Sequence, residues 1–203
     1  MLLETDRLVV RCATASDQDI EMYLALWNHP KVMEKVGFPE GLNISREEVA
    51  KILSHQPEGP FGGRLVVVDE TMARSLGEAH MRLPDEDGIS RTDVKLFPEH
   101  WGQGFGTEVK QGLVDYLFTH TDCRGIMADP RKDNLASQKM QEAVGARKVE
   151  ERDDHYVYVV SREDWERRRA EAFWQPERFG NRAKRWAGPG GIPLGKSRRV
   201  ESF

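Results

Sequence analysis

The sequence predicts an α+β protein built around one mixed, largely antiparallel sheet with helices on its flanks. Three strand-like segments follow one another in mid-chain, at Arg64–Asp69, Leu76–Leu83 and Ser90–Phe97. The connections between them are short and polar, and the second contains Pro84 and Gly88. Strands joined in this way form hairpins, so these three should run antiparallel to one another. Helix-like segments lie on both sides of this block, which completes the prediction.

Before this block, the chain predicts a first strand and then an amphipathic helix. Arg7–Cys12 alternates enough to form a half-buried strand. Ser16 precedes a helix that Asn28-His29-Pro30 ends. The apolar stripe of this helix follows the helical period and consists of Ile20, Tyr23, Leu24 and Trp27.

The second predicted helix has a stronger start signal. Ser45 and Glu48 have the spacing of a capping box, in which each side chain satisfies a main-chain N–H of the other end. Ile44 and Val49 occupy the positions of a hydrophobic staple around that cap. A helix is therefore expected to begin directly after Ser45.

After the three strands, a glycine-rich loop beyond Pro98 leads into a helix predicted over Thr107–Phe118. Ile126–Ala128 is a short buried strand. Asn134 can cap a further helix, and Gly145 ends it.

The last predicted strand is His155–Val160, and Ser161 begins a charged helix through Ala170 with Asp164 in its capping box. From Trp174 onward helical periodicity fails, and Gly188-Pro189-Gly190-Gly191 follows. The sequence therefore predicts one domain over residues 1–174, a size that allows a sizeable core, and an extension over residues 175–203.

Charge divides the chain in the same way. The formal net charge is −4, but residues 175–203 carry +5, so the remainder carries −9. An acidic body favours cationic partners, and amines are cationic near neutral pH. The basic extension is the one segment predicted to meet nucleic acid or another anionic partner. Trp174 and Trp186 predict that part of it docks on the body or on a second subunit, as in a homodimer.

Composition indicates a cytoplasmic protein without a metal. The longest apolar β-like run is Leu65–Val68, far short of a bilayer span, and the start of the chain lacks the pattern of an export signal. Cys12 and Cys123 are too few and too scattered for a disulfide framework or a zinc site.

The loop from Gly102 to Gly106 predicts an anion site. It ends a strand and opens a helix that lacks a Ser or Asp cap, so main-chain N–H groups and the positive end of the helix dipole are free to meet an anion. On the glycines alone, an ordinary turn between strand and helix is the favoured interpretation. The G-x-G-x-G spacing differs from a dinucleotide fingerprint, and no Gly-Lys-Ser/Thr follows as a P-loop requires.

Segment 97–108, FPEHWGQGFGTE, resembles the acyl-coenzyme A-binding motif of the GNAT superfamily of N-acetyltransferases. The closest likeness is to the branch of the ribosomal-protein alanine acetyltransferases RimJ and RimL. Glu4-Thr5-Asp6-Arg7-Leu8 is typical of the first strand in that branch, and Asn134-Leu135-Ala136-Ser137 matches a second family landmark. The resemblance extends to about Val160 and implies a GNAT fold and transfer of an acetyl group from acetyl-CoA to a primary amine.

The resemblance also implies roles for matching residues. Leu96 and Phe97 would carry a bulge that pairs with the pantetheine arm and polarises the thioester carbonyl. Asn134 would hydrogen-bond the cofactor, and Ser137 would lie near its sulfur, although helix capping is a competing interpretation for Ser137. If a proton donor is needed, Ser137 or a water would serve. The pyrophosphate would be held by main-chain N–H groups of Gly102, Gln103, Gly104, Phe105, Gly106 and Thr107.

Three residues depart from the family pattern. Trp101 stands where Gln or Arg is frequent, which affects loop packing more than phosphate contacts. Ala146, after Gly145, replaces the usual Phe. Gln141 stands where many members place a tyrosine acid, and an amide cannot give up a proton.

The general base stays open among three residues and water. Glu78 and His80 share one face of a predicted strand, where they could point at the amine or face solvent. Asp93 lies on the strand that enters the glycine loop. The acceptor could be a small amine, such as a polyamine, an aminoglycoside or an amino-acid derivative, or a protein amino terminus. A non-catalytic acyl-CoA-binding module for sensing or assembly is the alternative function.

Overall fold

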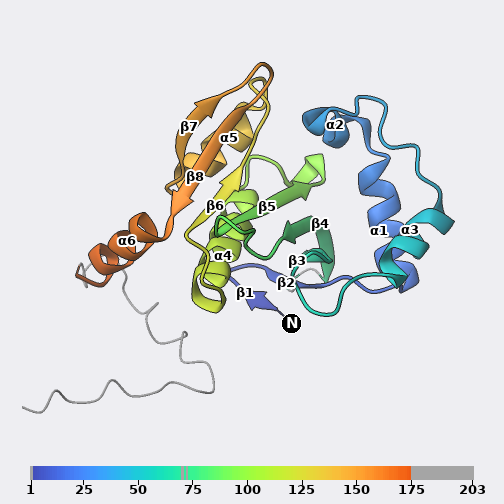
Figure 1. The fold of residues 1–203 in the computed structure, drawn as a ribbon. Coiled ribbons are helices and arrows are strands. Elements are labelled where there is room, and N and C mark those ends of the chain that lie inside the picture. The colour runs from blue at the N-terminus through green and yellow to red at the C-terminus, as the bar shows by residue number, and fades with distance from the viewer. Residues whose placement is uncertain (1, 70, 72, 175–203) are drawn as a thin grey trace, which may run out of the picture. The chain divides into compact units, whose positions relative to one another are not determined.

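A computed structural model describes residues 2–69, 71 and 73–174, apart from the side chains of residues 172–174. Residues up to Trp165 form one compact unit (Figure 1). A second unit begins at Glu166, within the helix Arg162–Trp174 (α6), and is described by itself. The predicted extension over residues 175–203 lies outside the described residues.

The first unit is built on an eight-stranded sheet in the order β1-β2-β3-β4-β5-β6-β8-β7 (Figure 1). Among the described strands, β5 and β6 form the parallel pair and the other neighbours are antiparallel, which confirms the predicted mixed, largely antiparallel sheet. The strands are β1 (Leu3–Glu4), β2 (Val9–Cys12), β3 (Arg64–Asp69), β4 (Arg74–Met81), β5 (Ile89–Leu96), β6 (Gly125–Ala128), β7 (Arg147–Glu151) and β8 (Tyr156–Ser161).

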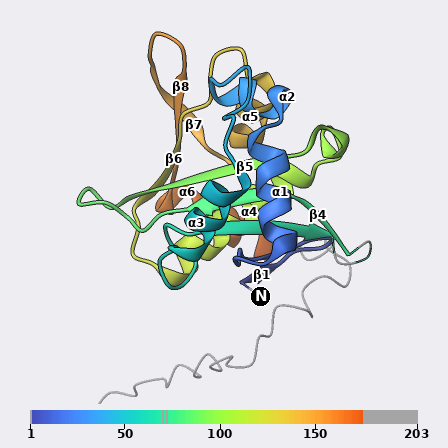
Figure 2. The ribbon, with the colours of Figure 1, turned by 90° about the vertical axis from the view of Figure 1, so that its right-hand side faces the viewer.

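Helices cover both faces of this sheet. Leu65 and Val67 of β3 share a core with Val109 and Leu113 of α4, so we call this side the α4 face. Val66, between them, packs with residues of α1, α2 and α3 on the opposite side, the α1 face, which Figure 2 views. The helices are α1 (Asp17–Trp27), α2 (Pro30–Met33), η1 (Glu34–Val36), α3 (Arg46–Ser54), η2 (Pro98–His100), α4 (Phe105–His120) and α5 (Leu135–Ala143). None of these described helices has the length and apolar composition of a membrane span.

Local signals placed the helix starts well. The Ser45 side chain accepts from the Glu48 N–H at 3.2 Å, and the Glu48 carboxylate accepts from the Ser45 N–H at 2.8 Å, so the predicted capping box is confirmed. Ser16 caps α1 in the predicted way. Strand and helix ends differ from the prediction by one to a few residues, as for the helix after the glycine loop, which begins at Phe105.

Two strands were not predicted, nor were the short helices α2, η1 and η2. β1 is two residues long, too short for a periodic signal. β7 is exposed at every position and carries charges on both of its faces, so it lacks the apolar alternation by which strands are found. It lies at the edge of the sheet, where charged side chains discourage pairing with other chains.

The parallel pair of β5 and β6 opens toward its carboxyl ends. Pairing covers Ile89 with Gly125, Ser90 with Ile126, and Arg91 with Met127. β5 then continues to Leu96 along β4, whereas β6 ends at Ala128. The second half of β5 therefore has a strand on one side and an opening on the other.

Candidate active site

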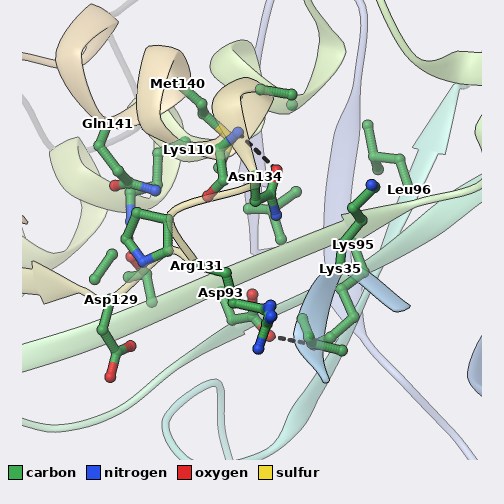
Figure 3. Close-up of a pocket in the computed structure, with 18 of the residues that line it drawn as sticks. Lys35, Asp93, Lys95, Leu96, Lys110, Asp129, Arg131, Asn134, Met140 and Gln141 are labelled. Carbon is green, nitrogen blue, oxygen red and sulfur yellow. Dashed lines mark hydrogen bonds and ion pairs between the residues drawn. The ribbon is translucent and has the colours of Figure 1, made fainter. Parts of the chain in front are cut away.

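A cavity of about 1610 Å³ lies at this opening. Beside the opening, its wall includes the second half of β5, the segment after β6, and α5 with its N-cap; η1, β3, β4, the glycine loop and α4 contribute further residues. Figure 3 shows Asp93 and Leu96 from the first, Asp129 and Arg131 from the second, and Asn134 and Gln141 from the third. Because the opening divides the sheet, residues of both faces reach one cavity.

The glycine loop forms one end of the cavity. Gly102 and Gly104 have φ values of +74° and +81°, in the left-handed region that side chains with a Cβ avoid. Gly104 is the N-cap of α4 and provides no side-chain cap. The first main-chain N–H groups of α4, including those of Gly106 and Thr107, therefore lack intrahelical acceptors at the positive end of the helix dipole. This arrangement can bind a phosphate group.

The amino-terminal turn holds this loop in place. Glu108, in the first turn of α4, accepts hydrogen bonds from the Thr5 hydroxyl at 2.6 Å and from Arg7 Nε at 2.7 Å. Burial opposes ionisation, but these hydrogen bonds lower the pKa of Glu108. Arg7 Nη1 also donates to the Gln103 carbonyl at 3.1 Å, and its guanidinium lies over the Phe105 ring. The segment Glu4–Leu8, which resembles the first strand of the family, therefore holds the glycine loop in place.

The main chain of β5 faces the cavity at every second residue. The Arg91 carbonyl accepts from Arg82, and the Phe97 N–H donates to Leu76, so odd-numbered residues of β5 face β4. Their even-numbered neighbours face the opposite side, and pairing with β6 stops at Arg91. Val94 and Leu96 thus present an edge that an extended ligand can pair with.

The prediction of a β-bulge at Leu96 and Phe97 was wrong. The β4–β5 ladder keeps a regular register through Leu96. The irregularity lies in the neighbouring ladder instead, where Leu76 of β4 has no partner opposite Val67 and Val68. Trp101 donates from its indole N–H to the Leu96 carbonyl at 2.8 Å, so this departure from the family pattern packs the loop against β5.

The second landmark begins α5 on the cavity wall. Asn134 Oδ1 accepts from the Ser137 N–H at 3.1 Å and caps the helix, which leaves its amide nitrogen for a ligand. The Ser137 hydroxyl lines the cavity and makes no hydrogen bond within the described part of the chain. Gln141 lies one turn further on, 3% exposed. All three side chains belong to one helical face.

The cavity brings most predicted cofactor residues together. The wall includes Leu96, Gly102, Gly104, Gly106, Thr107, Asn134 and Ser137. Phe97, Gln103 and Phe105 do not line it. Phe97 packs beside the α1 face core, Gln103 donates to the Glu99 carbonyl at 2.8 Å, and Phe105 is buried under Arg7. Of Gln103 and Phe105, the two that belong to the glycine loop, only the main-chain groups could contact a ligand.

Of the candidate bases, Asp93 lies on the α1 face of β5 beside the opening, with its side chain 49% exposed. Lys95 forms an ion pair with Asp93 and a second one with Glu78 at 3.0 Å. Burial raises the pKa of Asp93, but the charge of Lys95 outweighs it and lowers the pKa overall. Glu78 is 1% exposed and off the cavity wall, and its ion-pair partners Lys95 and Arg64 stand between it and the cavity.

His80 lies between Arg64 and Asp93 in a row across three strands. It lines the cavity, and its Nε2 lies 3.2 Å from the Gly62 carbonyl. Burial lowers the pKa of His80, and the positive charges of Arg64 and Arg82 add to this effect, against the pull of the Gly62 carbonyl. The imidazole is therefore neutral at pH 7 and can accept a proton.

Lys110 was not singled out from the sequence. It lies on α4 among apolar positions, is 2% exposed, and lines the cavity from the α4 face. Its ammonium donates to the Thr92 hydroxyl, and no carboxylate in the described chain lies within ion-pair distance. Burial lowers the pKa of Lys110 to about 8, although Asp93 and Asp129 oppose the shift. A single lysine at an inward helical position was the available signal.

A family model described as an acetyltransferase (GNAT) domain matches residues 7–147. The chain belongs to the GNAT acetyltransferase family. It is therefore an N-acetyltransferase, an enzyme of the acyltransferase class. The uncharacterised N-acetyltransferase p20 of Bacillus licheniformis is 28% identical over 149 residues, which cover 72% of this chain and 82% of that protein.

Solved GNAT structures have the same fold. The aminoglycoside acetyltransferase AAC(6')-Ib, in complex with ribostamycin and coenzyme A, has a TM-score of 0.66 at 22% identity, covering 81% of this chain and 98% of that one. Spermidine N-acetyltransferase from Vibrio cholerae, in complex with CoA and spermine, has a TM-score of 0.66 at 19% identity, covering 78% and 98%. At these identities the likeness establishes the fold.

Proposed function

We propose that this enzyme transfers an acetyl group from acetyl-CoA directly to an amine. One observation carries the proposal: the opening between β5 and β6 joins a phosphate-binding loop on one side to an accessible carboxylate, Asp93, on the other. Coenzyme A bound on the α4 face would therefore place its thioester in the opening. An amine could then reach the thioester from the α1 face.

Cavity residues fit coenzyme A in three places. The N–H groups at the start of α4 would hold the pyrophosphate, with Gly102 and Gly104 allowing its close approach. The main chain of Val94 and Leu96 would pair with the amide groups of the pantetheine arm. The free amide nitrogen of Asn134 would donate to the same arm. Complexes of two structural neighbours with coenzyme A support this placement.

Direct transfer needs the amine as a free base. Asp93 would bind the incoming ammonium ion, and His80, its direct partner on the neighbouring strand β4, would take its proton directly or through a water. The amine nitrogen then attacks the thioester carbon and gives up a second proton. The C–S bond breaks with its electron pair leaving on the thiolate, which takes up a proton in exchange. Ser137 is one group that can return a proton to the sulfur, and Lys110 is a second. Glu78 would act on Asp93 only by holding Lys95.

Two classes of acceptor fit this reaction, a small amine and a protein amino terminus. Ribostamycin and spermine in the complexes of structural neighbours support a small amine. The likeness of Glu4–Leu8 to the ribosomal-protein branch supports a protein amino terminus. Gln141 in place of a tyrosine acid is the feature that favours the alternative, a non-catalytic acyl-CoA-binding module.

Thiol release separates the two functions. The full chain is incubated with acetyl-CoA and a panel of small amines, amino acids and short peptides, and free CoA is followed with a thiol reagent. We expect acceptor-dependent thiol release that is saturable in both substrates. Tight binding of CoA without acceptor-dependent thiol release across the panel would establish the binding module instead.

A further inference from the structure

The α1 face of the cavity carries basic side chains in ordered rows. The antiparallel register sets Arg64, His80 and Asp93 side by side on β3, β4 and β5. The next row toward the β5–β6 pair holds Arg82 and Arg91, because Met81 pairs with Thr92. Side chains two residues apart on a strand share a face, so both rows point to the same side of the sheet.

Most acidic groups near these rows are already engaged. Asp93 and Glu78 share the ammonium of Lys95, and Arg91 pairs with Asp129 at 3.4 Å. Arg64 forms an ion pair with the remaining oxygen of Glu78 at 3.9 Å, and its guanidinium lies 5.0 Å from the ring centre of Trp27. Neither contact is a hydrogen bond, so the side-chain N–H groups of Arg64 are still available to a ligand.

Two further cations of the wall have no acidic partner within the described part of the chain. Arg82 is exposed and Lys35, on η1, is half-buried; neither forms an ion pair there. Figure 3 labels Lys35 among the residues that line the cavity. Arg64, Arg82 and Lys35 are therefore a set of cavity-lining cations with unused donors, here called the basic triad.

The local charge is opposite to that of the whole protein. Residues 1–174 carry −9, which led us to expect cationic acceptors. The cavity wall, however, contains eight lysines and arginines against three aspartates. Three of the eight lie on the coenzyme side: Lys110 on α4, Arg131 in the loop before α5, and Lys139 on α5. A polyamine on the α1 face would meet like charges, which disfavour its binding.

We infer that the acceptor carries a carboxylate or a phosphate in addition to its amino group, and that the basic triad binds this anion while Asp93 receives the amine. Adjacent rows on the face lie about 7 Å apart, so the anion and the amine should be a few bonds from each other. Arginine forms bidentate hydrogen bonds with both anions. This inference rests on the proposed function, since it names the substrate class of the same site.

The test compares acceptors that differ only in the anion. The first pair is an L-amino acid and its carboxamide, and the second is glucosamine 6-phosphate and glucosamine. Spermidine and a short peptide amide represent amines without a nearby anion. With saturating acetyl-CoA, kcat/KM is measured by thiol release. We expect the anionic member of at least one pair to be preferred by about tenfold or more, and the pair shows which anion is used.

Arg82→Gln should reduce that preference by about tenfold, because it removes an exposed guanidinium that supports no other described side chain. The matched control is Arg46→Gln on α3, the same change at an exposed arginine outside the cavity wall. Raising the salt concentration should weaken the preference in the native enzyme and have less effect in the Arg82 variant.

Three results would overturn the inference: a neutral or polycationic amine as the best acceptor, equal use of both members of each pair, or an unchanged preference after Arg82→Gln. If no acceptor is turned over, the proposed function fails instead. Binding of each pair to the CoA-loaded protein, measured by calorimetry, then decides the inference by the same ranking.

Discussion

In the proposed site, the two halves of the cavity offer their ligands different kinds of groups. On the α4 face, the groups available to coenzyme A are mainly main-chain N–H and C=O groups, at Gly104, Gly106 and along the edge of β5. On the α1 face, the groups available to the acceptor are charged side chains, placed by the register of three strands. The first half depends on backbone conformation and the second on which side chains stand at fixed positions.

This difference explains how one fold can keep its donor and change its acceptor. A phosphate cradle made of main chain tolerates substitution at most positions, provided that the left-handed glycines remain. A wall of side chains changes its charge with each substitution on β3, β4 or β5 while the sheet stays intact. On such a fold, the choice of acceptor is therefore set by the side chains of the site and not by the fold itself.

The largest expected effect breaks the cofactor half alone. Gly104→Val forces a β-branched residue to a φ of +81° at the N-cap of α4 and places its Cβ 3.5 Å from Arg7 Nη2. We expect CoA affinity, measured by calorimetry, to fall by at least about 100-fold, or roughly 3 kcal/mol.

The control for this change is Gly59→Val. Gly59 has a similar φ of +86° with open space around it, and it lies outside the cavity wall. It should show a comparable loss of stability with unchanged CoA affinity. Unchanged affinity in the Gly104 variant would remove the loop from the cofactor site.

The next effect breaks the acceptor half and leaves the cofactor half intact. Asp93→Asn and His80→Gln should each lower kcat by about 100-fold. The CoA dissociation constant, measured by calorimetry, should stay within about twofold, because neither side chain belongs to the α4 face. Asp17→Asn, at an exposed acid on α1, is the control. A large change in CoA affinity in either variant would contradict the separation of the two halves.

The pH profile sharpens this prediction. A base works when it is deprotonated, and burial lowers the pKa of His80 from the ordinary 6.5. The acid limb of kcat/KM that belongs to the enzyme should therefore lie below pH 6.5, and the acceptor amine should titrate at higher pH. His80→Gln should abolish the acid limb, whereas a limb that persists in this variant would assign it to Asp93.

The sequence could predict the half of the site that depends on local backbone conformation better than the half that depends on strand pairing. The glycine loop, the cap at Asn134 and the capping box at Ser45 are local, because each depends on a few consecutive residues. The three candidate bases were named correctly as residues of the central strands. Their environment depends on pairing partners distant in the chain, so the burial of Glu78 under Lys95 could not be deduced.

Net charge does not report the charge of the cavity wall, for a related reason. It sums the whole surface, whereas the acceptor meets only the wall of the cavity. Arg64, Arg82 and Arg91 lie far apart in sequence and become neighbours only through the register. The bulge expected at Leu96 was inferred from likeness to a family, and in this chain the irregularity lies one ladder away, at Leu76.

The smallest expected effect concerns Lys110, at the boundary of the two halves. A buried ammonium without an ion-pair partner is costly, so Lys110→Met should stabilise the protein by about 1–3 kcal/mol at pH 7. The folded-state pKa of about 8 lies below the ordinary 10.5, so the unfolded chain binds the proton more tightly. The cost is thus fully present below pH 8 and disappears as the pH rises toward 10.5.

Urea unfolding at pH 7 and pH 10 measures the stability gained by Lys110→Met and its dependence on pH. The gain in the free energy of unfolding should be smaller at pH 10 than at pH 7. Lower stability of the variant at pH 7 would mean that Thr92, Asp93 and Asp129 already compensate the charge. Val109→Ala, at the adjacent buried position, is the packing control and should be destabilised equally at both pH values. If the more stable variant also loses kcat without losing CoA affinity, the lysine is kept for proton transfer to the sulfur, since a destabilising buried charge needs a functional reason to persist.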